Sequence, residues 1–477
     1  MPQKRIPTPT QDAGNWGTIL NDHIAQTQNP LNGAFNSFDQ FSARPTNLTT
    51  DDAGKTYLYT QTGNWHEWSG SEWRVTNNVG IYNVLDYGCV ADNNFDNSII
   101  LQTLFNKLKN TSFSIYFPPS SNYYKFNTVV NIDNTKPFSI LGAGSDVSKI
   151  NAPNGAFYIL GKVSSATQFY KDQVNISNLT INNLSSIFTA TAIHLNSCNM
   201  NIDDVGINGK WNRCLDLENC WFSTVNKVYG TVFVDNSTEI TNFNHGFLQG
   251  SFIYLLGSVS ININNCQTYG FKYGFFASDQ RPDNHYCEGI TFYGCVAQFV
   301  DHGIYLEHGT LTSIQGCTLT QCTYSAVTNL AGIGTQITNS WLEGPTVNHA
   351  SEVNAQTFVG FKLGNSTTSC SAIGNSFVGG TPGSKAFAID GNNHHIALNR
   401  GNMTNSARLN NEVYGNGHYI FGNMGQGFEA NSFSNGYTGR FSTDANILEY
   451  NDNTAAIAGG LRPGSTYRTG DNLKIVH

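Results

Sequence analysis

Two acidic residues stand at comparable places in neighbouring segments of the chain. Asp279 ends the segment GFFASD, and Glu307 lies in the segment GIYLEH. Hydrolysis of a glycosidic bond needs a carboxylic acid and a carboxylate, close together for a retaining reaction and about 6.5–9.5 Å apart for an inverting one. Asp279 and Glu307 are therefore candidate catalytic groups, provided that the fold brings their segments side by side.

The residues around these two acids are suited to proton transfer and sugar binding. The candidate catalytic residues are Glu307, Asp279, Asp301, His302, His285 and Tyr286, and the candidate substrate-binding residues are Tyr305, Phe276, Arg281, Lys272, His308 and Glu218. A lyase would instead use Tyr286 or His285 as a base, with Arg281 or Lys272 neutralising a uronate. Many exposed acids serve only solvation and turns, so each named carboxylate is only a candidate. Glu307 is the best single candidate among them.

A sequence repeat supplies the scaffold that these residues need. Short β-prone runs recur from about residue 174, each followed by Gly or Asn, and most intervals are 22 to 26 residues. The aligned inward positions are Ile176, Ile202, Val225, Ile263, Phe292, Ile314, Ile337, Ile373, Ile396 and Ile420. One coil cannot bury its own apolar face, so the period predicts a β-solenoid whose coils stack about 4.8 Å apart.

A second run in each coil predicts which side chains face outward. Alternation points Leu215, Phe275, Ile304, Phe361 and Phe387 inward. The outward set is then Asp216, Glu218, Phe276, Ser278, Tyr305, Glu307, Asn329, Lys362 and Asp390. One face of the solenoid is therefore expected to be polar and aromatic.

Small polar residues follow the aligned positions by three. They are Cys266, Cys295, Cys317, Ser340, Ser376, Asn399 and Asn423. We interpret them as an interior ladder of like side chains at a strand-ending turn. The ten cysteines show no CxxC metal spacing, so buried reduced thiols are expected, with Cys214 and Cys220 as one possible pair across a turn.

The composition excludes several classes of function. Charged residues make up 12% of 477, the net charge is -8, and no basic run exceeds Lys4-Arg5, which argues against a nucleic-acid partner. We find no signal peptide and no apolar stretch of about 18 residues, so we expect synthesis in the cytoplasm without membrane insertion. No metal or cofactor is expected, although calcium stays open.

Residues 84–126 carry a motif that resembles a known family. The stretch VLDYGCVADNNFDNSIILQTLFNKLKNTSFSIYFPPSSNYYKF is similar to the opening segment of the pectate-lyase-like superfamily found in phage tailspike depolymerases. The matching residues are Asp86, Tyr87, Gly88, Asp92, Asp96, Gln102, Phe117, Pro118, Pro119 and Tyr123. The resemblance implies an all-β fold, a right-handed single-stranded parallel β-helix, assembled as a homotrimer.

Within this segment we expect a short capping helix and structural carboxylates. Asp96 or Asn97 would cap the helix, and Ile99, Ile100, Leu104, Phe105 and Leu108 would form its apolar face. Such a lid is needed because an open β-helix end exposes a strand edge.

The expected organisation has five parts. They are a particle-attachment leader (1–50), a small aromatic-rich β module (51–80), the opening segment with its capping helix (81–130), the parallel β-helix (131–430) and a C-terminal element (431–477). In the small module, Trp65, Trp68 and Trp73 are expected to pack rather than to bind sugars.

Two functions of different class fit these observations. The first is a tailspike-like depolymerase that cleaves a bacterial surface polysaccharide, with hydrolysis favoured over elimination. The second is a non-catalytic glycan-binding adhesin on the same scaffold. Either would act outside the cell on a phage tail or similar injection particle, bound to its baseplate.

Overall fold

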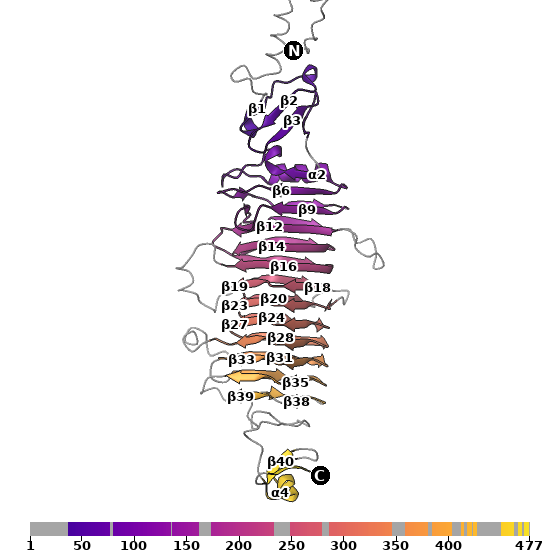
Figure 1. The fold of residues 1–477 in the computed structure, drawn as a ribbon, viewed down its shortest axis with the longest axis vertical. Helices are drawn as coiled ribbons and strands as arrows, with labels where there is room; N and C mark the ends of the chain where they lie inside the picture. Colours follow the sequence, from indigo (N-terminus) through magenta and orange to yellow (C-terminus); the bar gives the residue numbers. More distant parts are fainter. Residues whose placement is uncertain are drawn as a thin grey trace, which may run out of the picture.

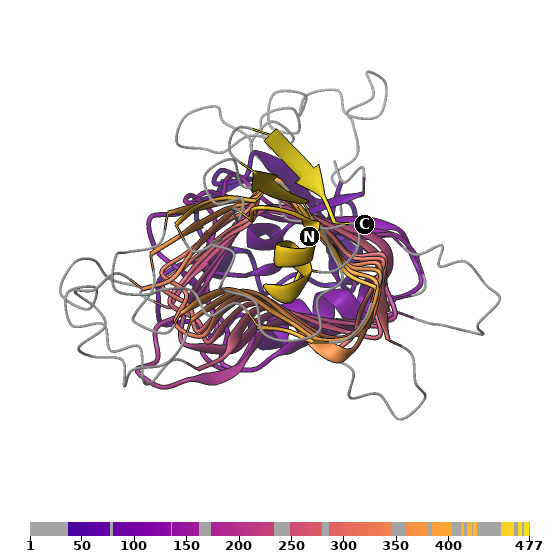
Figure 2. The same cartoon turned by 90° about the horizontal axis from the view of Figure 1, so that it is seen from below.

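The protein is a long rod of stacked coils with a small module at each end (Figure 1). The computed structural model describes residues 37–76, 80–134, 136–161, 173–232, 249–278, 286–345, 358–379, 384–402, 412–414, 417–421, 423–426, 450–461, 466–469 and 472–476. Seen end-on, the coils superpose into one outline (Figure 2), and the buried side chains form one continuous core. The expected parallel β-helix is confirmed.

Each complete coil contributes strands to three faces, which we number in chain order. First-face strands are β5 (Ile81–Asn83), β6 (Phe113–Phe117), β9 (Phe138–Gly142), β18 (Val259–Asn264), β22 (Thr291–Tyr293), β26 (Ser313–Gln315), β29 (Gln336–Thr338), β32 (Ser371–Ile373), β35 (His395–Ala397) and β38 (Tyr419–Phe421). Second-face strands are β7 (Tyr124–Lys125), β10 (Lys149–Asn151), β19 (Gln267–Tyr269), β23 (Val296–Gln298), β27 (Thr318–Thr320), β30 (Trp341–Glu343), β33 (Ser376–Val378), β36 (Arg400–Asn402) and β39 (Met424–Gln426). The long strands β12 (Gln173–Asn183), β14 (Asn199–Gly209) and β16 (Trp221–Thr231) run across both of these faces.

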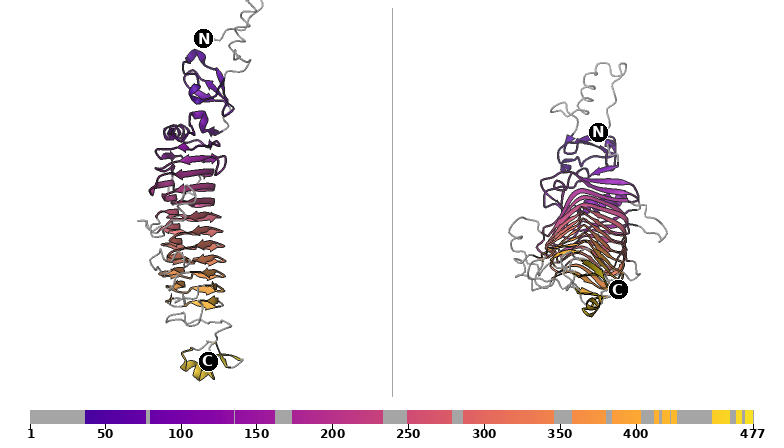
Figure 3. Two further views of the ribbon diagram at one scale, coloured as in Figure 1. Left: turned by 90° about the vertical axis from the view of Figure 1, so that its left-hand side faces the viewer. Right: turned by 60° about the horizontal axis from the view of Figure 1, so that its bottom comes forward.

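The third face is a parallel sheet of eleven strands. They are β8 (Val130–Asp133), β11 (Phe157–Leu160), β13 (Thr189–Asn196), β15 (Trp211–Glu218), β17 (Ser251–Leu256), β20 (Tyr273–Ser278), β24 (His302–Leu306), β28 (Ser325–Ile333), β31 (Val359–Thr368), β34 (Lys385–Ile389) and β37 (Glu412–Val413). Two short strands, β21 (Cys287–Glu288) and β25 (Gly309–Thr310), lie between the third face and the next first face. The side view in Figure 3 shows the regular spacing of the stacked coils.

The predicted register of the first face is confirmed with one exception. Ile263 pairs with Phe292, and Phe292 pairs with Ile314, so the aligned side chains lie directly over one another. Ile337, however, pairs with Ala372 rather than Ile373. The alignment was one residue out at this coil, because both residues are apolar and only the cross-coil pairing decides between them.

A left-handed residue turns the chain at the corner between the first and second faces. Asn265 has φ 52°, and Gly294, Gly316 and Asn339 hold the same corner on the next three coils at φ 62°, 61° and 50°. Gly and Asn are the residues that adopt this conformation at least cost. The Gly or Asn that closes each first-face run is therefore the corner itself.

The residue after each corner points inward and forms the expected ladder. Thiols of Cys295 and Cys317 lie 3.3 and 3.7 Å from the carbonyl oxygens of Ile263 and Phe292 on the preceding coil. Further along, Asn399 Oδ1 accepts from the Asn375 backbone N–H at 2.9 Å, and Asn399 Nδ2 donates to Asn423 Oδ1 at 2.9 Å. Asn375, not Ser376, occupies the ladder, as the shifted alignment requires.

The capping helix α2 (Ser98–Leu108) covers the first coils as expected, but its apolar face differs from the prediction. Ile99 is 72% exposed, and Leu101 is buried in its place beside Leu104, Phe105 and Leu108. Asp96, rather than Asn97, accepts the Ser98 backbone N–H at 3.0 Å. Asn97 is the N-cap residue and makes no side-chain cap hydrogen bond, and the predicted face keeps Leu104, Phe105 and Leu108.

The N-terminal module pairs β1 (Ser37–Phe38), β2 (Thr56–Tyr59), β3 (Asn64–Trp68) and β4 (Trp73–Val75), with 3-10 turns at Phe41–Ala43 and Thr50–Asp52. A third 3-10 turn, Val84–Tyr87, carries buried Asp86, whose carboxylate accepts hydrogen bonds from Thr62 and Asn64, both at 2.6 Å. Asp86 thus joins the module to the β-helix and is structural, as expected. At the other end lie α4 (Asn453–Ala458), β40 (Thr466–Thr469) and β41 (Asn472–Ile475).

Other predictions about buried residues have mixed outcomes. The inward set of the third face is confirmed. Of the set predicted to face outward, Asn329 and Ser278 are fully buried and Asp216 is only 4% exposed. Asn329 shares a column with the apolar Leu306 and Leu363. All ten cysteines are free and buried, so Cys214 and Cys220 form no disulfide. No described helix is long and apolar enough to cross a membrane.

The interior amides predict a test of coil stacking. Replacing Asn399 by Ala leaves at least two buried partners unpaired, at about 1–3 kcal/mol each, so the free energy of unfolding should fall by about 2–6 kcal/mol. Denaturant unfolding measures this change. Asn212→Ala, at an exposed asparagine of β15, is the control, and its free energy of unfolding should stay within about 0.5 kcal/mol of wild type. Equal effects of the two substitutions would show that the Asn ladder does not stabilise the stacking of the coils.

Candidate functional site

The outer surface of the third face carries a continuous aromatic and polar column. Register places Tyr158, His194, Asp216, Tyr254, Phe276, Tyr305, Thr328 and Lys362 over one another on successive strands. We call this column and its outward neighbours on the same strands the third-face strip. The strip places on one surface residues that are more than 200 positions apart in the sequence.

Aromatic contacts run along the middle of the strip. Phe276 lies with its ring centroid 5.2 Å from that of Tyr254 and 5.6 Å from that of Tyr305. Tyr273 stacks on Phe276 at 4.7 Å and on His302 at 5.2 Å. Phe276 meets Tyr254 and Tyr305 edge-to-face, at 77° and 69°, so these rings hold one another in place and form an aromatic cluster between polar groups.

Glu307 lies directly after β24 at one side of this aromatic surface. Ser278 on the neighbouring coil donates a hydrogen bond to Glu307 Oε2 at 2.8 Å. Burial raises the pKa of Tyr273, and the charges of Glu307 and Asp301 raise it further. The predicted catalytic carboxylate is thus on the surface of the strip and within electrostatic reach of a tyrosine hydroxyl.

Tyr286 and His308 form a wall beside Glu307. Their rings stack with centroids 3.8 Å apart and an angle of 12° between the planes. His308 follows Glu307 in the chain, so the Tyr286–His308 stack lies at the same end of β24 as Glu307. Asp279, Arg281 and His285 lie outside the described residues.

Asp301 and His302 lie at the opposite end of β24, at the corner with the second face. Burial raises the pKa of Asp301 to about 7, against the opposing effect of nearby Lys272, and Asp301 Oδ1 has no hydrogen-bond partner among the described atoms. Burial, assisted by Lys272 and Lys362, lowers the pKa of His302 to about 4. At neutral pH His302 is therefore neutral, and Asp301 is partly protonated.

The distance along β24 separates Asp301 from Glu307. Six residues of extended chain span about 20 Å, and the two side chains shorten this gap by only a few ångströms. A carboxyl pair that acts on one glycosidic bond lies within about 9.5 Å. Asp301 and Glu307 therefore do not form such a pair.

A second acidic cluster, one that the sequence reasoning did not assemble, lies three strands away on the strip. His194 Nδ1 is 3.0 Å from Asp216 Oδ2, and His194 Nε2 is 3.6 Å from Glu218 Oε2. Arg213 Nη1 lies 2.7 Å from the same Asp216 oxygen, and Tyr158 stacks on the imidazole at 4.6 Å. Alternation had marked Asp216 and Glu218 as outward, but His194 comes from a run left out of the alignment.

Tyr254 connects the second cluster to Glu307. The Arg213 guanidinium carbon lies 3.6 Å from the centre of the Tyr254 ring. Ser278, the residue that donates to Glu307, lies close enough to the Tyr254 hydroxyl to oppose the rise of its pKa. Burial, above all, raises the pKa of Tyr254, with smaller contributions from Asp216 and Glu307. A connected set of polar contacts thus crosses four adjacent strands, β15, β17, β20 and β24.

Two further candidates for chemistry, His394 and Glu343, lie apart from the strip. His394 is buried and stacks on His418 at 5.1 Å, so it has a packing role. Glu343 lies on the second face, where its carboxylate accepts from Gln321 at 3.0 Å and from Trp341 at 3.1 Å. The part of the chain that the structure describes contains no group of three or more His, Cys, Asp or Glu side chains arranged to hold a metal ion.

Comparison with known proteins identifies the fold. No family model and no curated protein matches the sequence. Among solved structures, the tailspike protein of Acinetobacter phage vB_ApiP_P1 is similar, with 14% identity, a TM-score of 0.50, and coverage of 88% of this chain and 77% of the tailspike. At this identity the match establishes the right-handed, single-stranded parallel β-helix and no more.

Weaker matches include both an enzyme and an adhesin. The catalytic unit of a GH87 α-1,3-glucanase from Streptomyces thermodiastaticus is 14% identical, with a TM-score of 0.43, and covers 77% of this chain and 69% of its own. PfbA, a surface adhesin of Streptococcus pneumoniae, is 10% identical, with a TM-score of 0.46 and coverages of 72% and 85%.

The raised pKa of Asp301 predicts a pH-dependent effect on stability. Because the folded pKa of about 7 exceeds the ordinary 3.8, folding opposes ionisation, and wild-type stability falls as pH rises from about 4 to 7. Asp301→Asn removes this effect, so its advantage in unfolding temperature should be small at pH 4.5 and larger at pH 7.5. A constant difference between the two proteins across this range would contradict the assignment.

Proposed function

We propose that the protein is a tailspike-like depolymerase that binds a bacterial surface polysaccharide along the third-face strip and hydrolyses it. One observation carries the proposal: the connected contacts from Asp216 through Arg213, Tyr254 and Ser278 to Glu307, beside the half-buried rings of Phe276 and Tyr305. Four strands at about 4.8 Å spacing extend over about 14 Å, a length suited to several sugar units of a polymer.

The side chains of the strip match the two chemical faces of a sugar ring. Aromatic rings such as Phe276 and Tyr305 pack against the C–H face, while Lys272, His308 and Glu218 meet hydroxyl groups. A small number of placed polar groups on an aromatic surface is the usual form of a ligand site.

Hydrolysis fits the charges better than elimination does. A lyase must accept a uronate carboxylate, but Arg213 on the strip is already paired with Asp216, and Glu218 and Glu307 add further negative charge beside it. Like charges at short range in a partly buried site oppose such a substrate. Carboxyl groups are also the groups that glycoside hydrolysis uses.

In the proposed reaction, Glu307 is the principal catalytic residue. One carboxyl group protonates the glycosidic oxygen as the bond to the anomeric carbon breaks, and a carboxylate takes the proton of the water that attacks that carbon. Asp279, next in sequence to Ser278, is the proposed partner of Glu307. His285 and Tyr286 are proposed to assist proton transfer, and Arg281 to bind the sugar. Asp301 and His302, at the opposite edge of the strip, are proposed to assist the reaction without pairing with Glu307.

The proposed setting is the tail of a phage or a related particle. The tailspike that shares this fold supports that setting, as does the resemblance of residues 84–126. We propose a homotrimer attached through residues 1–50, acting outside the cell. A non-catalytic adhesin is the competing function, and the binding surface would be the same.

The central test replaces Glu307 by Gln. We expect cleavage, measured as new reducing ends from capsular or lipopolysaccharide polymer, to fall by about 10²–10⁴-fold while the polymer is still retained. Glu288→Gln, at an exposed acid on β21, is the matched control and should cleave at the wild-type rate. Unsaturated uronate absorbance in the wild-type products would indicate a lyase, and retention without any cleavage by wild type would indicate an adhesin.

The trimer gives an independent prediction. Light scattering on the purified full-length chain should give a mass three times the 52.2 kDa of one chain. A mass of one or two chains would rule out the proposed assembly without affecting the assignment of the strip.

A further inference from the structure

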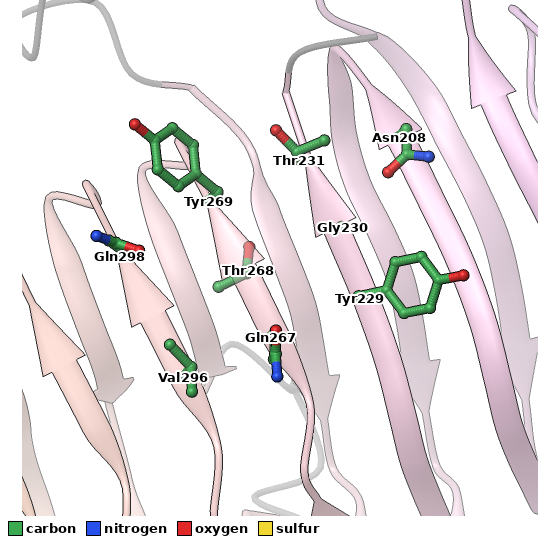
Figure 4. A pocket seen from close by; sticks show the side chains of 9 residues that line it. All are labelled: Asn208, Tyr229, Gly230, Thr231, Gln267, Thr268, Tyr269, Val296 and Gln298. Atoms are coloured by element: carbon green, nitrogen blue, oxygen red, sulfur yellow. The ribbon is translucent and has the colours of Figure 1, made fainter. Parts of the chain in front are cut away.

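A separate pocket lies on the outer surface of the second face. It has a volume of about 200 Å³ and is formed by strands β14, β16, β19 and β23 (Figure 4). Its lining residues are Asn208, Tyr229, Gly230, Thr231, Gln267, Thr268, Tyr269, Val296 and Gln298. None of them belongs to the third-face strip.

The register of the strands explains the shape of the pocket. Tyr229 pairs with Gln267, and Thr231 pairs with Tyr269, so the two tyrosines stand diagonally on adjacent strands. Their rings lie on either side of Thr231 and Thr268 in Figure 4. Tyr229 lies close over Gly206 on β14, where an added Cβ would meet its ring at 2.9 Å. Gly206 therefore lets the Tyr229 ring lie close to β14, away from Tyr269.

Both tyrosines are held in place by their surroundings. The Tyr269 ring packs against Phe299 with centroids 4.9 Å apart, and burial raises the pKa of Tyr269. Burial, and then the charges of Asp146 and Asp204, raise the pKa of Tyr229. Fixed aromatic rings lose little conformational entropy on binding a ligand.

The chemistry of the lining selects a class of ligand. Two aromatic rings offer packing surfaces, and the amides of Asn208, Gln267 and Gln298 offer both donors and acceptors for hydroxyl groups. No lining residue is charged, and nearby Asp146 and Asp204 disfavour an anion. The volume is below the roughly 300–1,000 Å³ of sites for larger ligands, so it suits one small ring.

We propose that this pocket is a second glycan site, which binds one neutral sugar unit and takes no part in cleavage. That the sugar belongs to the same surface polysaccharide rests on the proposed function. Two separated sites on one rod raise the retention of a repeating polymer without any new contact at the strip.

The test measures binding of neutral methyl glycosides of glucose, galactose and mannose to the full chain by saturation-transfer NMR and calorimetry. We expect at least one to bind, and Tyr269→Ala to weaken it by about three- to tenfold, the effect of losing one aromatic contact. Tyr269→Phe should restore binding because it keeps the ring. Tyr293→Ala removes a tyrosine that is 50% exposed on the first face and should change nothing.

Several outcomes would overturn the proposal: no binding by any of the three glycosides, binding unaffected by Tyr269→Ala, or an equal loss in Tyr293→Ala. Glu307→Gln should bind the glycosides as wild type does. Binding at the pocket is thereby measured separately from cleavage at the strip, so failure of one proposal leaves the other standing.

Discussion

Every functional feature of this protein depends on the register between successive coils. Parallel backbone pairing fixes which residue lies over which, and buried side chains such as Ile263, Phe292 and Ile314 fix it further because a shift by one residue would turn them outward. The same register sets the outward columns. The contacts among Asp216, Tyr254 and Glu307 exist only because the intervening coils stack without slipping.

Much of the fold could be predicted from the sequence because inward and corner positions are constrained in residue type. The repeat of apolar runs closed by Gly or Asn identifies the coil, and nine of ten aligned positions hold. The errors occur where two neighbours are chemically alike. Ala372 and Ile373 are both apolar, as are Ile99 and Leu101, and buried Asn329 finds partners in Gly309 and Thr335 that no local pattern reveals.

The candidate site was less accessible to prediction. Glu307, Tyr305 and Phe276 follow from simple alternation within well-aligned runs. His194, by contrast, can be recognised as a site residue only from its contacts with Asp216 and Glu218 on the next strand, and its own run was not part of the alignment. Asp301 shows the opposite error: it is near Glu307 in sequence, which suggested one shared site, but an extended strand holds the two residues apart.

The corner residues between the first and second faces separate two kinds of position. Asn265, Gly294 and Gly316 set the path of the backbone, and the residues that follow them fill the interior, so neither group has much freedom. Outward side chains contribute little to the backbone path or to the packing of the interior. Their identities can drift, and a new sugar specificity can arise by exchanging surface residues on an unchanged rod, which fits a shared fold at 14% identity with a phage tailspike.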